Sequence, residues 1–469
     1  MKSVFIKAGL LTCLLVGIIT QEASAESTLA TKCSLFEKNT NPPFQQMNCL
    51  LTNAAIEADI PPEVVKAVAY QESGWSQFTK KNEPNISPDV GIGIMQVTDT
   101  ENLDVEKLKY DITYNIEAGV KILNDKYAYD LPKIKGAGRH EIENWYFPIM
   151  AYNGTKAVNS PVYKSNGEKN TAAYQEEVFS IIEKASFLTG TKLASFPFES
   201  SDFVYESTDN IKFNKSVYTL NNLHTSVYFL KKGDKVVVTI DNSKLRGKPT
   251  TSSEVKNTAL KDSILTINND FSYDVKSTIE NQFVWFPVKT AEGKSGYISS
   301  AYIKRWDAST APSKPKVNKI TDQDVVITGK ASSNVKVIAK GTKIMGQKTA
   351  KNGIFKITIK KQPAGTKISI YAKDASGNIS ESTRMTVIDK TPPAKPSNNK
   401  ATSKQVTGKS EKGATITIHK GKKQIGKGTV DKKGKFTVKI IKQKKGTLVN
   451  IVAKDNAGNK SNPSSVKVK

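Results

Sequence analysis

Glu72 is the residue whose type and position best suit proton-transfer chemistry. It follows Val65, Val68 and Ala69 at helical spacing, so it belongs to the apolar face of a predicted helix and should point inward. Burial removes a carboxyl from water and raises its pKa. Such a carboxyl can donate a proton near neutral pH, as the departing oxygen of a glycosidic bond requires. The alternative is a Glu that ends an amphipathic helix and forms only local hydrogen bonds.

The elements that would position Glu72 are also predicted to be helical. Pro61 and Pro62 mark the start of its own helix, because proline is tolerated in the first turn. Apolar residues recur with the helical period over residues 114–127, and residues 145–152 and 172–188 are two further helical stretches. The sequence therefore predicts a mainly α-helical domain over residues 31–188.

Short motifs accompany Glu72 along this region. Glu72-Ser73 is followed by Gly93-Ile94-Met95-Gln96 and then by Ala151-Tyr152-Asn153-Gly154, with a helical Asn-Ile-Glu-Ala-Gly segment from Asn115 between them. In this order they resemble the Glu-Ser, Gly-x-Met-Gln and Ala-Tyr-Asn motifs of soluble lytic transglycosylases. Those enzymes have the goose-type lysozyme fold of glycoside hydrolase family 23. The family usually reads Ala-Tyr-Asn-x-Gly, so the turn after Asn153 is expected to differ by one residue.

The resemblance implies one acid/base residue, Glu72. It would protonate the oxygen between N-acetylmuramic acid and N-acetylglucosamine, then accept the proton of the muramic 6-hydroxyl as that group closes on the anomeric carbon. The product would be a 1,6-anhydro sugar, formed without water. Ser73 and Gln96 would line the groove, and Tyr152 and Asn153 would support Glu72 and contact sugar. No metal or organic cofactor is implied.

Two rival interpretations stay open. If Asp89, Asp99 or Asp111 positioned a water molecule beside Glu72, the enzyme would be a hydrolase of the lysozyme (muramidase) type. The second rival is a non-catalytic cell-wall-binding or adhesion protein that keeps the fold only to bind sugar. Trp75 and Trp145 suit either sugar stacking or helix packing.

The hydrophobic period changes after the helical region. Residues 201–306 contain short alternating runs typical of strands. Two motifs resemble those of bacterial Src-homology-3-like wall-binding domains. The first is Arg-x-x-Pro, which begins at Arg246, and the second is Trp285 followed by Gly-Tyr-Ile, which ends at Ile298. Trp285 and Tyr297 would form an aromatic platform in such a domain, or Trp285 would pack in its core. Residues 201–244 have no assignment of their own, and residues 307–316 are expected to be a linker.

The C-terminal third is an internal repeat. Ile327-Thr328-Gly329-Lys330 returns as Val406-Thr407-Gly408-Lys409, and an Asp-x-x-Gly-Asn turn occurs at 374–378 and again at 455–459. Repeats of about 80 residues with many short strands indicate β-sandwiches. Both copies, residues 317–390 and 391–469, resemble bacterial immunoglobulin-like domains. The expected fold class is thus multidomain: a mainly α lysozyme-like domain, an all-β barrel and two β-sandwich repeats.

The charge of the chain is concentrated at its C-terminal end. The chain has 469 residues and a formal charge of +26. Residues 311–469 carry 36 Lys and Arg against 8 Asp and Glu. A segment with such an excess of positive charge attracts polyanions. For an exported protein these are expected to be anionic cell-wall polymers rather than nucleic acid; the alternative is a solvated lysine-rich surface.

The N-terminus has the pattern of an export signal. A basic start, an apolar stretch over residues 10–19 and Ala-Ser-Ala at 23–25 predict a signal peptide over residues 1–25. The mature chain is expected to be a monomer, secreted and cell-wall associated, without a membrane span. Cys33 and Cys49 then remain and are expected to form a disulfide, worth roughly 3 kcal/mol in the chain-entropy model. His140, His224 and His419 show no spacing typical of a metal site or a Cys-His pair.

Overall fold

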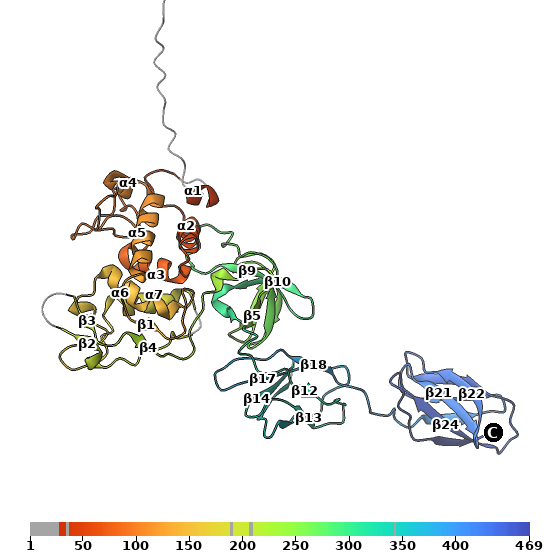
Figure 1. Ribbon diagram of the computed structural model, residues 1–469. Helices are drawn as coiled ribbons and strands as arrows, with labels where there is room; N and C mark the ends of the chain where they lie inside the picture. Colours follow the sequence, from red (N-terminus) through yellow and green to blue (C-terminus); the bar gives the residue numbers. More distant parts are fainter. Residues whose placement is uncertain (1–27, 34–36, 188–190, 206–209, 342–343) are drawn as a thin grey trace, which may run out of the picture. The chain divides into compact units, whose positions relative to one another are not determined.

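The computed structural model describes residues 28–33, 37–187, 191–205, 210–341 and 344–469 (Figure 1). The expected signal peptide lies outside these residues. The chain divides into two compact units, with the boundary between Arg305 and Trp306. No helix within the described ranges is both long enough and apolar enough to cross a bilayer.

The first unit begins with a helical domain, as the sequence predicts. Its helix α3 begins at Pro62 and ends before Gly74, whose φ of 61° is the left-handed conformation that glycine adopts without strain. Helix α5 begins after Asp111, whose carboxylate accepts hydrogen bonds from the amides of Thr113 and Tyr114. The helices are α1 Thr28–Lys32, α2 Phe44–Glu57, α3 Pro62–Ser73, α4 Val105–Tyr110, α5 Ile112–Tyr127, α6 Tyr146–Asn153 and α7 Tyr174–Ala185.

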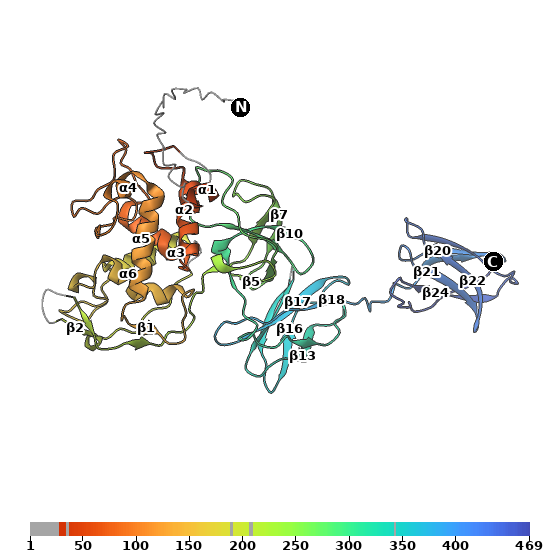
Figure 2. The same ribbon diagram turned by 45° about the horizontal axis from the view of Figure 1, so that its top comes forward.

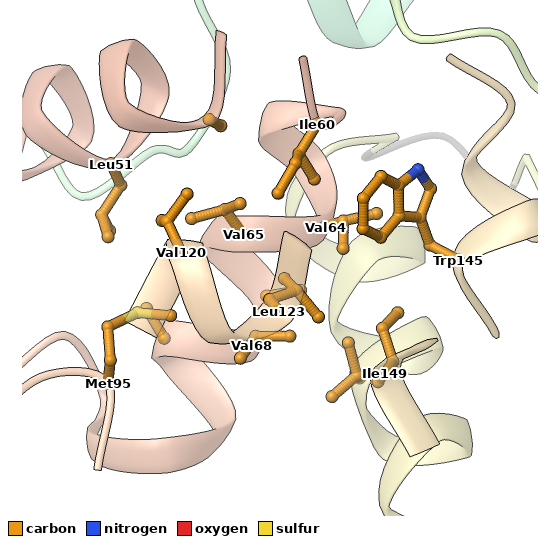
Figure 3. Close-up of a cluster of buried hydrophobic side chains, with 14 of the residues drawn as sticks. Leu51, Ile60, Val64, Val65, Val68, Met95, Val120, Leu123, Trp145 and Ile149 are labelled. Atoms are coloured by element: carbon orange, nitrogen blue, oxygen red, sulfur yellow. The ribbon is translucent and has the colours of Figure 1, made fainter. Parts of the chain in front are cut away.

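The core of the helical domain lies between these helices. Helix α3 packs against α2 and α7, and α5 packs against α6 (Figures 1 and 2). Figure 3 shows apolar side chains of α3, such as Val68, facing those of α5, such as Leu123, with Trp145 at the edge of the cluster. Trp145 is fully buried and Trp75 is 4% exposed and stacked on Phe44. Both tryptophans therefore pack in the core.

The helical domain extends beyond its expected end at residue 188. Short strands β2 Phe203–Val204 and β3 Lys212–Phe213 pair with each other, and β4 Val217–Tyr218 pairs in parallel with β1 Lys133–Ile134. The buried residues Phe203 and Tyr218 belong to the same core as the helices. The sequence places these residues in the block 201–306 but assigns them no element of their own. Their aromatic side chains instead bury their area against α6.

An antiparallel sheet of seven strands completes the first unit. Its order is β11-β5-β8-β9-β10-β6-β7. The strands are β5 Lys235–Val238, β6 Ser243–Arg246, β7 Val255–Ala259, β8 Ile264–Ile267, β9 Trp285–Lys289, β10 Ser295–Ser299 and β11 Ile303–Arg305. Trp285 is 3% exposed and donates a hydrogen bond from its indole to Asp274, whereas Tyr297 is half-buried. We call residues 226–305 the sheet domain.

Buried polar groups join the sheet domain to α3. The ammonium of Lys66, with a fully buried side chain, donates to the hydroxyl of Tyr228 at 2.5 Å and to the carbonyl of Gln282 at 2.6 Å. One turn earlier, the carboxylate of Glu63 accepts a hydrogen bond of 2.8 Å from Ser226. Burial lowers the pKa of Lys66 to about 7. The helix that carries Glu72 is thus fixed to the sheet domain by groups with no access to water.

The second unit consists of two β-sandwich repeats. Strands β12 to β18 form the sheets β12-β13-β16 and β15-β14-β17-β18, and β19 to β25 form the equivalent sheets β19-β20-β23 and β22-β21-β24-β25. In repeat 1 they are β12 Lys316–Val317, β13 Val326–Lys330, β14 Lys336–Gly341, β15 Ile344–Thr349, β16 Ile354–Thr358, β17 Lys367–Lys373 and β18 Thr383–Thr386. In repeat 2 they are β19 Ser397–Ala401, β20 Gln405–Lys409, β21 Thr415–Lys420, β22 Lys423–Thr429, β23 Lys435–Lys439, β24 Leu448–Lys454 and β25 Ser464–Lys467. The multidomain fold class is confirmed: a helical region followed by antiparallel sheets and sandwich repeats.

The repeated Asp-x-x-Gly-Asn segments are turns. In repeat 1 the carboxylate of Asp374 accepts hydrogen bonds from the amide and the side chain of Asn378, at 2.8 and 2.9 Å. Asp455 and Asn459 repeat this arrangement at the same distances. Each carboxylate satisfies the donors of its own turn, which explains why Asp, Gly and Asn recur at the same positions in both copies.

Candidate active site

Glu72 lies in the last turn of α3, partly buried, beside the first turn of α7. The hydroxyl of Tyr174 donates to its Oε1 at 2.5 Å. Burial raises the pKa of Glu72, the hydrogen bond from Tyr174 lowers it, and the nearby charge of Asp89 raises it; the net pKa is about 7. At neutral pH the carboxyl therefore populates both its acid and its ionised form, which suits a group that must first donate and later accept a proton.

Two tyrosines flank this carboxyl. Burial, reinforced by the charge of Glu72, holds the pKa values of Tyr152 and Tyr174 well above their usual range, so both hydroxyls stay neutral donors. Tyr152 donates to the carbonyl of Met95 at 2.7 Å. The sequence alone does not indicate that Tyr174 belongs to the site. It lies 102 residues from Glu72, and its position in the first turn of a predicted helix carried no signal of a site.

Two buried amides fix the loop that contains Gly93, Met95 and Gln96. The side chain of Asn115 accepts from the amide of Met95 at 3.0 Å and donates to the carbonyl of Ile92 at 2.8 Å. The side-chain oxygen of Gln77 accepts from the amide of Ile94 at 2.9 Å. Both amide side chains are fully buried, so the loop has little freedom to move relative to α5.

The motif glycines permit close approach of this loop to α5. Gly93 has a φ of 73°, and a Cβ there would lie 2.4 Å from Nδ2 of Asn115. A Cβ on Gly119 of α5 would lie 2.3 Å from Cβ of Met95. Met95 itself is fully buried, so it forms part of the wall beneath the loop. The spacing of Gly-x-Met-Gln and Asn-x-x-x-Gly thus has a packing explanation.

Ser73 joins the end of α3 to the loop that contains Gln96. The hydroxyl of Ser73 lies 2.8 Å from the carbonyl of Ile94 and accepts from the amide of Ser76 at 3.0 Å. Ser73 also lines a cavity of about 450 Å³ with polar neighbours such as Asn85. The side-chain amide of Gln96 donates to the carbonyl of Gly93 at 2.7 Å, within the loop itself. The structure therefore brings Glu72, Ser73 and the Gln96 loop together.

Asn153 lies at the end of α6, one residue after Tyr152. Its side chain is exposed, and its oxygen accepts a hydrogen bond of 3.0 Å from Asn159. Gly154 follows with a φ of 104°, and its carbonyl accepts from the same Asn159 amide at 2.8 Å. The shortened turn after the Ala-Tyr-Asn motif thus requires a glycine directly after Asn153.

The three other carboxylates differ in their surroundings. Asp111 caps α5, and Asp99 accepts from the amide of Glu101 at 3.3 Å. Asp89 is exposed, accepts a hydrogen bond of 2.6 Å from Ser87, and has a pKa lowered by that bond. Of the three, Asp89 is the one whose charge raises the pKa of Glu72.

The remaining candidates are structural. Cys33 and Cys49 form a disulfide with their Cα atoms 5.6 Å apart. His224 contacts the buried carboxylate of Glu143 at 2.7 Å, and His140 stacks on Phe229. Within the described part of the chain, no group of three or more His, Cys, Asp and Glu side chains is arranged to hold a metal ion.

Comparisons with known proteins match two parts of the chain to protein families. Residues 50–175 match the family described as Transglycosylase SLT domain, and residues 311–389 and 392–469 each match Bacterial Ig domain. The chain is also similar to the "Cell wall-associated protease" of Bacillus subtilis (strain 168). The two are 31% identical over 179 residues, which cover 37% of this chain and 20% of that protein. The chain spans about a fifth of the length of that relative.

Solved structures add distant similarities. One is the BSP domain of a biofilm-associated protein, at 13% identity and a TM-score of 0.16, covering 53% of this chain and 62% of that chain. Another is a 1.5-MDa bacterial ice-binding adhesin, at 14% identity and a TM-score of 0.18, covering 50% and 86%. Similarity at this level does not establish a common overall fold.

The family matches identify the parts of the chain. Residues 50–175 are a transglycosylase SLT domain, and two bacterial Ig domains follow it in the same chain.

Proposed function

We propose that this protein is a secreted peptidoglycan lytic transglycosylase that cleaves the β-1,4 bond between N-acetylmuramic acid and N-acetylglucosamine. The observation that carries the proposal is the environment of Glu72. Within the SLT domain, a partly buried carboxyl with a pKa of about 7 accepts a hydrogen bond from a neutral tyrosine. One such carboxyl suffices for a reaction in which the substrate supplies its own nucleophile.

The reaction needs two proton transfers at Glu72. The acid form donates its proton to the glycosidic oxygen as the bond from that oxygen to the muramic anomeric carbon breaks. The resulting carboxylate accepts the proton of the muramic 6-hydroxyl as O6 bonds to the anomeric carbon, which gives the 1,6-anhydro ring and restores the acid form. The hydroxyl of Tyr174 stabilises the carboxylate between these steps, because it donates to Oε1.

A hydrolytic outcome is the second candidate, and Asp89 is the residue that favours it. Its charge acts on Glu72, and it is exposed to water. In an inverting hydrolase a second carboxylate activates water on the opposite face of the sugar, and the product has a reducing end. A non-catalytic sugar-binding role is the remaining alternative. Product chemistry separates all three.

The sandwich repeats and the sheet domain would bring the enzyme to its substrate. The 36 basic against 8 acidic side chains of residues 311–469 suit anionic polymers of the cell wall. The motifs from Arg246 to Ile298, which lie in the sheet domain and resemble those of wall-binding domains, point to the same location.

The test is mass spectrometry of purified peptidoglycan digested by residues 26–469. Glu72→Gln is the test variant, and Glu106→Gln, which removes an exposed carboxyl of α4, is the matched control. We expect fragments one water lighter than reducing muropeptides, lost at least about 100-fold with Glu72→Gln and unchanged with the control. Reducing fragments would establish the hydrolase. No fragments from folded protein would favour the binding protein.

A further inference from the structure

A long connection separates the two tyrosines that flank Glu72. Tyr152 lies near the end of α6, and Tyr174 is the first residue of α7. Helix α7 packs against both α6 and α3, and Figure 1 shows α6 and α7 side by side. Residues 154–173 join the two helices and contain the short 3-10 helix η2 Ala157–Asn159. A connection with so little regular structure fixes the helix that follows it only where its own groups hold that helix.

Asn159 is buried at the centre of this connection and is 5% exposed. Its side-chain nitrogen donates to the carbonyl of Gly154 at 2.8 Å and to the side-chain oxygen of Asn153 at 3.0 Å. Its side-chain oxygen accepts from the backbone amide of Tyr174 at 3.4 Å. One carboxamide therefore serves the C-terminal end of α6 and the N-terminal end of α7, where backbone groups have no partner within the helix itself.

A second hydrogen bond holds the same point of the chain. The side-chain nitrogen of the fully buried Gln175 donates to the backbone carbonyl of Asn159 at 2.9 Å and to the hydroxyl of Tyr146 at 3.3 Å. Two consecutive residues of α7 thus bind Asn159, Tyr174 through its backbone and Gln175 through its side chain. Because buried hydrogen bonds of this kind are costly to break, they fix the first turn of α7 relative to the end of α6.

The position of α7 matters because Tyr174 acts directly on Glu72. Three groups from three parts of the chain influence this carboxyl: the hydroxyl of Tyr174, the charge of Asp89 and the ring of Tyr152. Tyr174 does so through a hydrogen bond of 2.5 Å to Oε1. Hydrogen bonds weaken steeply as their distance and angle depart from the optimum. A small displacement of α7 would therefore weaken this bond and leave Asp89 where it is.

We infer that Asn159 is a positioning residue for the reaction, which holds the first turn of α7 so that the hydroxyl of Tyr174 meets the carboxylate of Glu72. Its bonds to Asn153 and Gly154 make the turn after the Ala-Tyr-Asn motif the fixed end of the connection. The residue type fits this role, because a carboxamide carries both donors and an acceptor on one short side chain. This inference rests on the proposed function, in which Glu72 alternates between acid and carboxylate.

The test follows the ionisation of Glu72 directly, by carbon NMR of residues 26–469 isotope-labelled at the side-chain carboxyl of Glu. The Glu72 signal is the one lost in Glu72→Gln. Asn159→Leu keeps the approximate size of the side chain and removes its hydrogen bonds. It should raise the pKa of Glu72, because it weakens the Tyr174 bond that lowers this pKa. In the Tyr174→Phe protein, the same substitution should change the pKa no further.

Asn144→Leu is the matched control. Asn144 is 4% exposed, lies in the 3-10 helix η1 Ile142–Trp145, and forms side-chain hydrogen bonds with Tyr127, Ile134 and Gly138. Its substitution should lower the melting temperature and leave the pKa of Glu72 in place. The alkaline limb of kcat/KM is the second readout and should move with this pKa in every variant.

A second variant removes the other bond. Gln175→Leu eliminates the donor to the carbonyl of Asn159 and should also raise the pKa of Glu72. An unchanged pKa in both Asn159→Leu and Gln175→Leu, while Tyr174→Phe raises it, would overturn the inference alone. A further rise when Asn159→Leu is added to Tyr174→Phe would also overturn it, because Asn159 would then act by another route.

Two outcomes concern the proposed function. If Tyr174→Phe left the pKa of Glu72 unchanged, the inference would fall together with the role of Tyr174 in stabilising the carboxylate. If the pKa responded as expected but the folded, unaltered protein released no fragments from peptidoglycan, the proposed function would be contradicted while the effect of Asn159 on Tyr174 stood.

Discussion

Two neighbours act on the pKa of Glu72 in opposite directions. Tyr174 stabilises the ionised carboxyl by a hydrogen bond, and Asp89 destabilises it by its charge. A general acid must be protonated, so kcat/KM should fall as the pH rises through about 7, the pKa of Glu72. Tyr174→Phe should move this alkaline limb to higher pH, and Asp89→Asn should move it to lower pH.

The measurement is kcat/KM on soluble peptidoglycan strands between about pH 5 and 9. Asp125→Asn removes an exposed carboxylate of α5 and should leave the limb in place. Shifts of the same sign in both variants would contradict the assignment of Glu72 as the acid. Retained cleavage by Asp89→Asn with an anhydro product would exclude Asp89 as a required water-activating base.

At the scale of elements, helix α3 both packs against the sheet domain and carries Glu72. Its first turns hold Glu63 and Lys66 against the sheet domain, and its last turn holds Glu72. Tyr228→Phe removes one acceptor from the buried Lys66, which should lower the free energy of unfolding by about 1–3 kcal/mol. The pKa of Lys66 is lowered to about 7, so the group is charged below that pH and needs the acceptor most there. The loss should be larger at pH 6 than at pH 9.

Urea unfolding at both pH values checks this expectation. The control is Tyr163→Phe, which alters a ring that is 42% exposed. The unfolded state of Lys66 binds a proton up to its ordinary pKa near 10.5, whereas the folded state releases it near 7. The cost of burying its charge is therefore complete below pH 7 and declines between 7 and 10.5. An equal loss at both pH values would mean that the hydroxyl matters only as a neutral partner.

At the scale of the whole molecule, the first unit contains the SLT domain and the second unit carries most of the positive charge. The outer faces of the repeats place lysines opposite each other across neighbouring strands, as with Lys316 and Lys330, and Lys409 and Lys435. Such pairs destabilise a sheet unless anions lie nearby. We expect the full chain to bind isolated cell walls at 0.1 M salt and to be released at 1 M, because the screening length falls from about 10 Å to 3 Å.

A chain that ends at Arg305 isolates the contribution of the second unit. It should keep the activity on soluble strands and lose the salt-dependent part of wall binding. Both forms are compared by sedimentation with walls over a salt series. Retention of the full chain that persists unchanged in strong salt would contradict the electrostatic account.

Much of the fold was predictable because it depends on local pattern. The helical period around Glu72, the change to alternating strands and the internal repeat each come from neighbouring residues. The motif order led to the SLT domain, and the repeat led to the bacterial Ig domains. The Src-homology-3-like assignment and the roles of Ser73, Gln96, Tyr152 and Asn153 stay predictions.

Only the tertiary structure decided which distant groups share an environment. Tyr174 donates a hydrogen bond to Glu72 across 102 residues of sequence, and Lys66 is buried against the sheet domain. Phe203, Ile211 and Tyr218 join the helical core. None of these follows from local spacing, because a pKa or a buried hydrogen bond depends on what the folded chain places around a group. The sequence by itself determined the catalytic candidate and the order of domains. Long-range packing determined the electrostatics of the site and the extent of the domain that holds it.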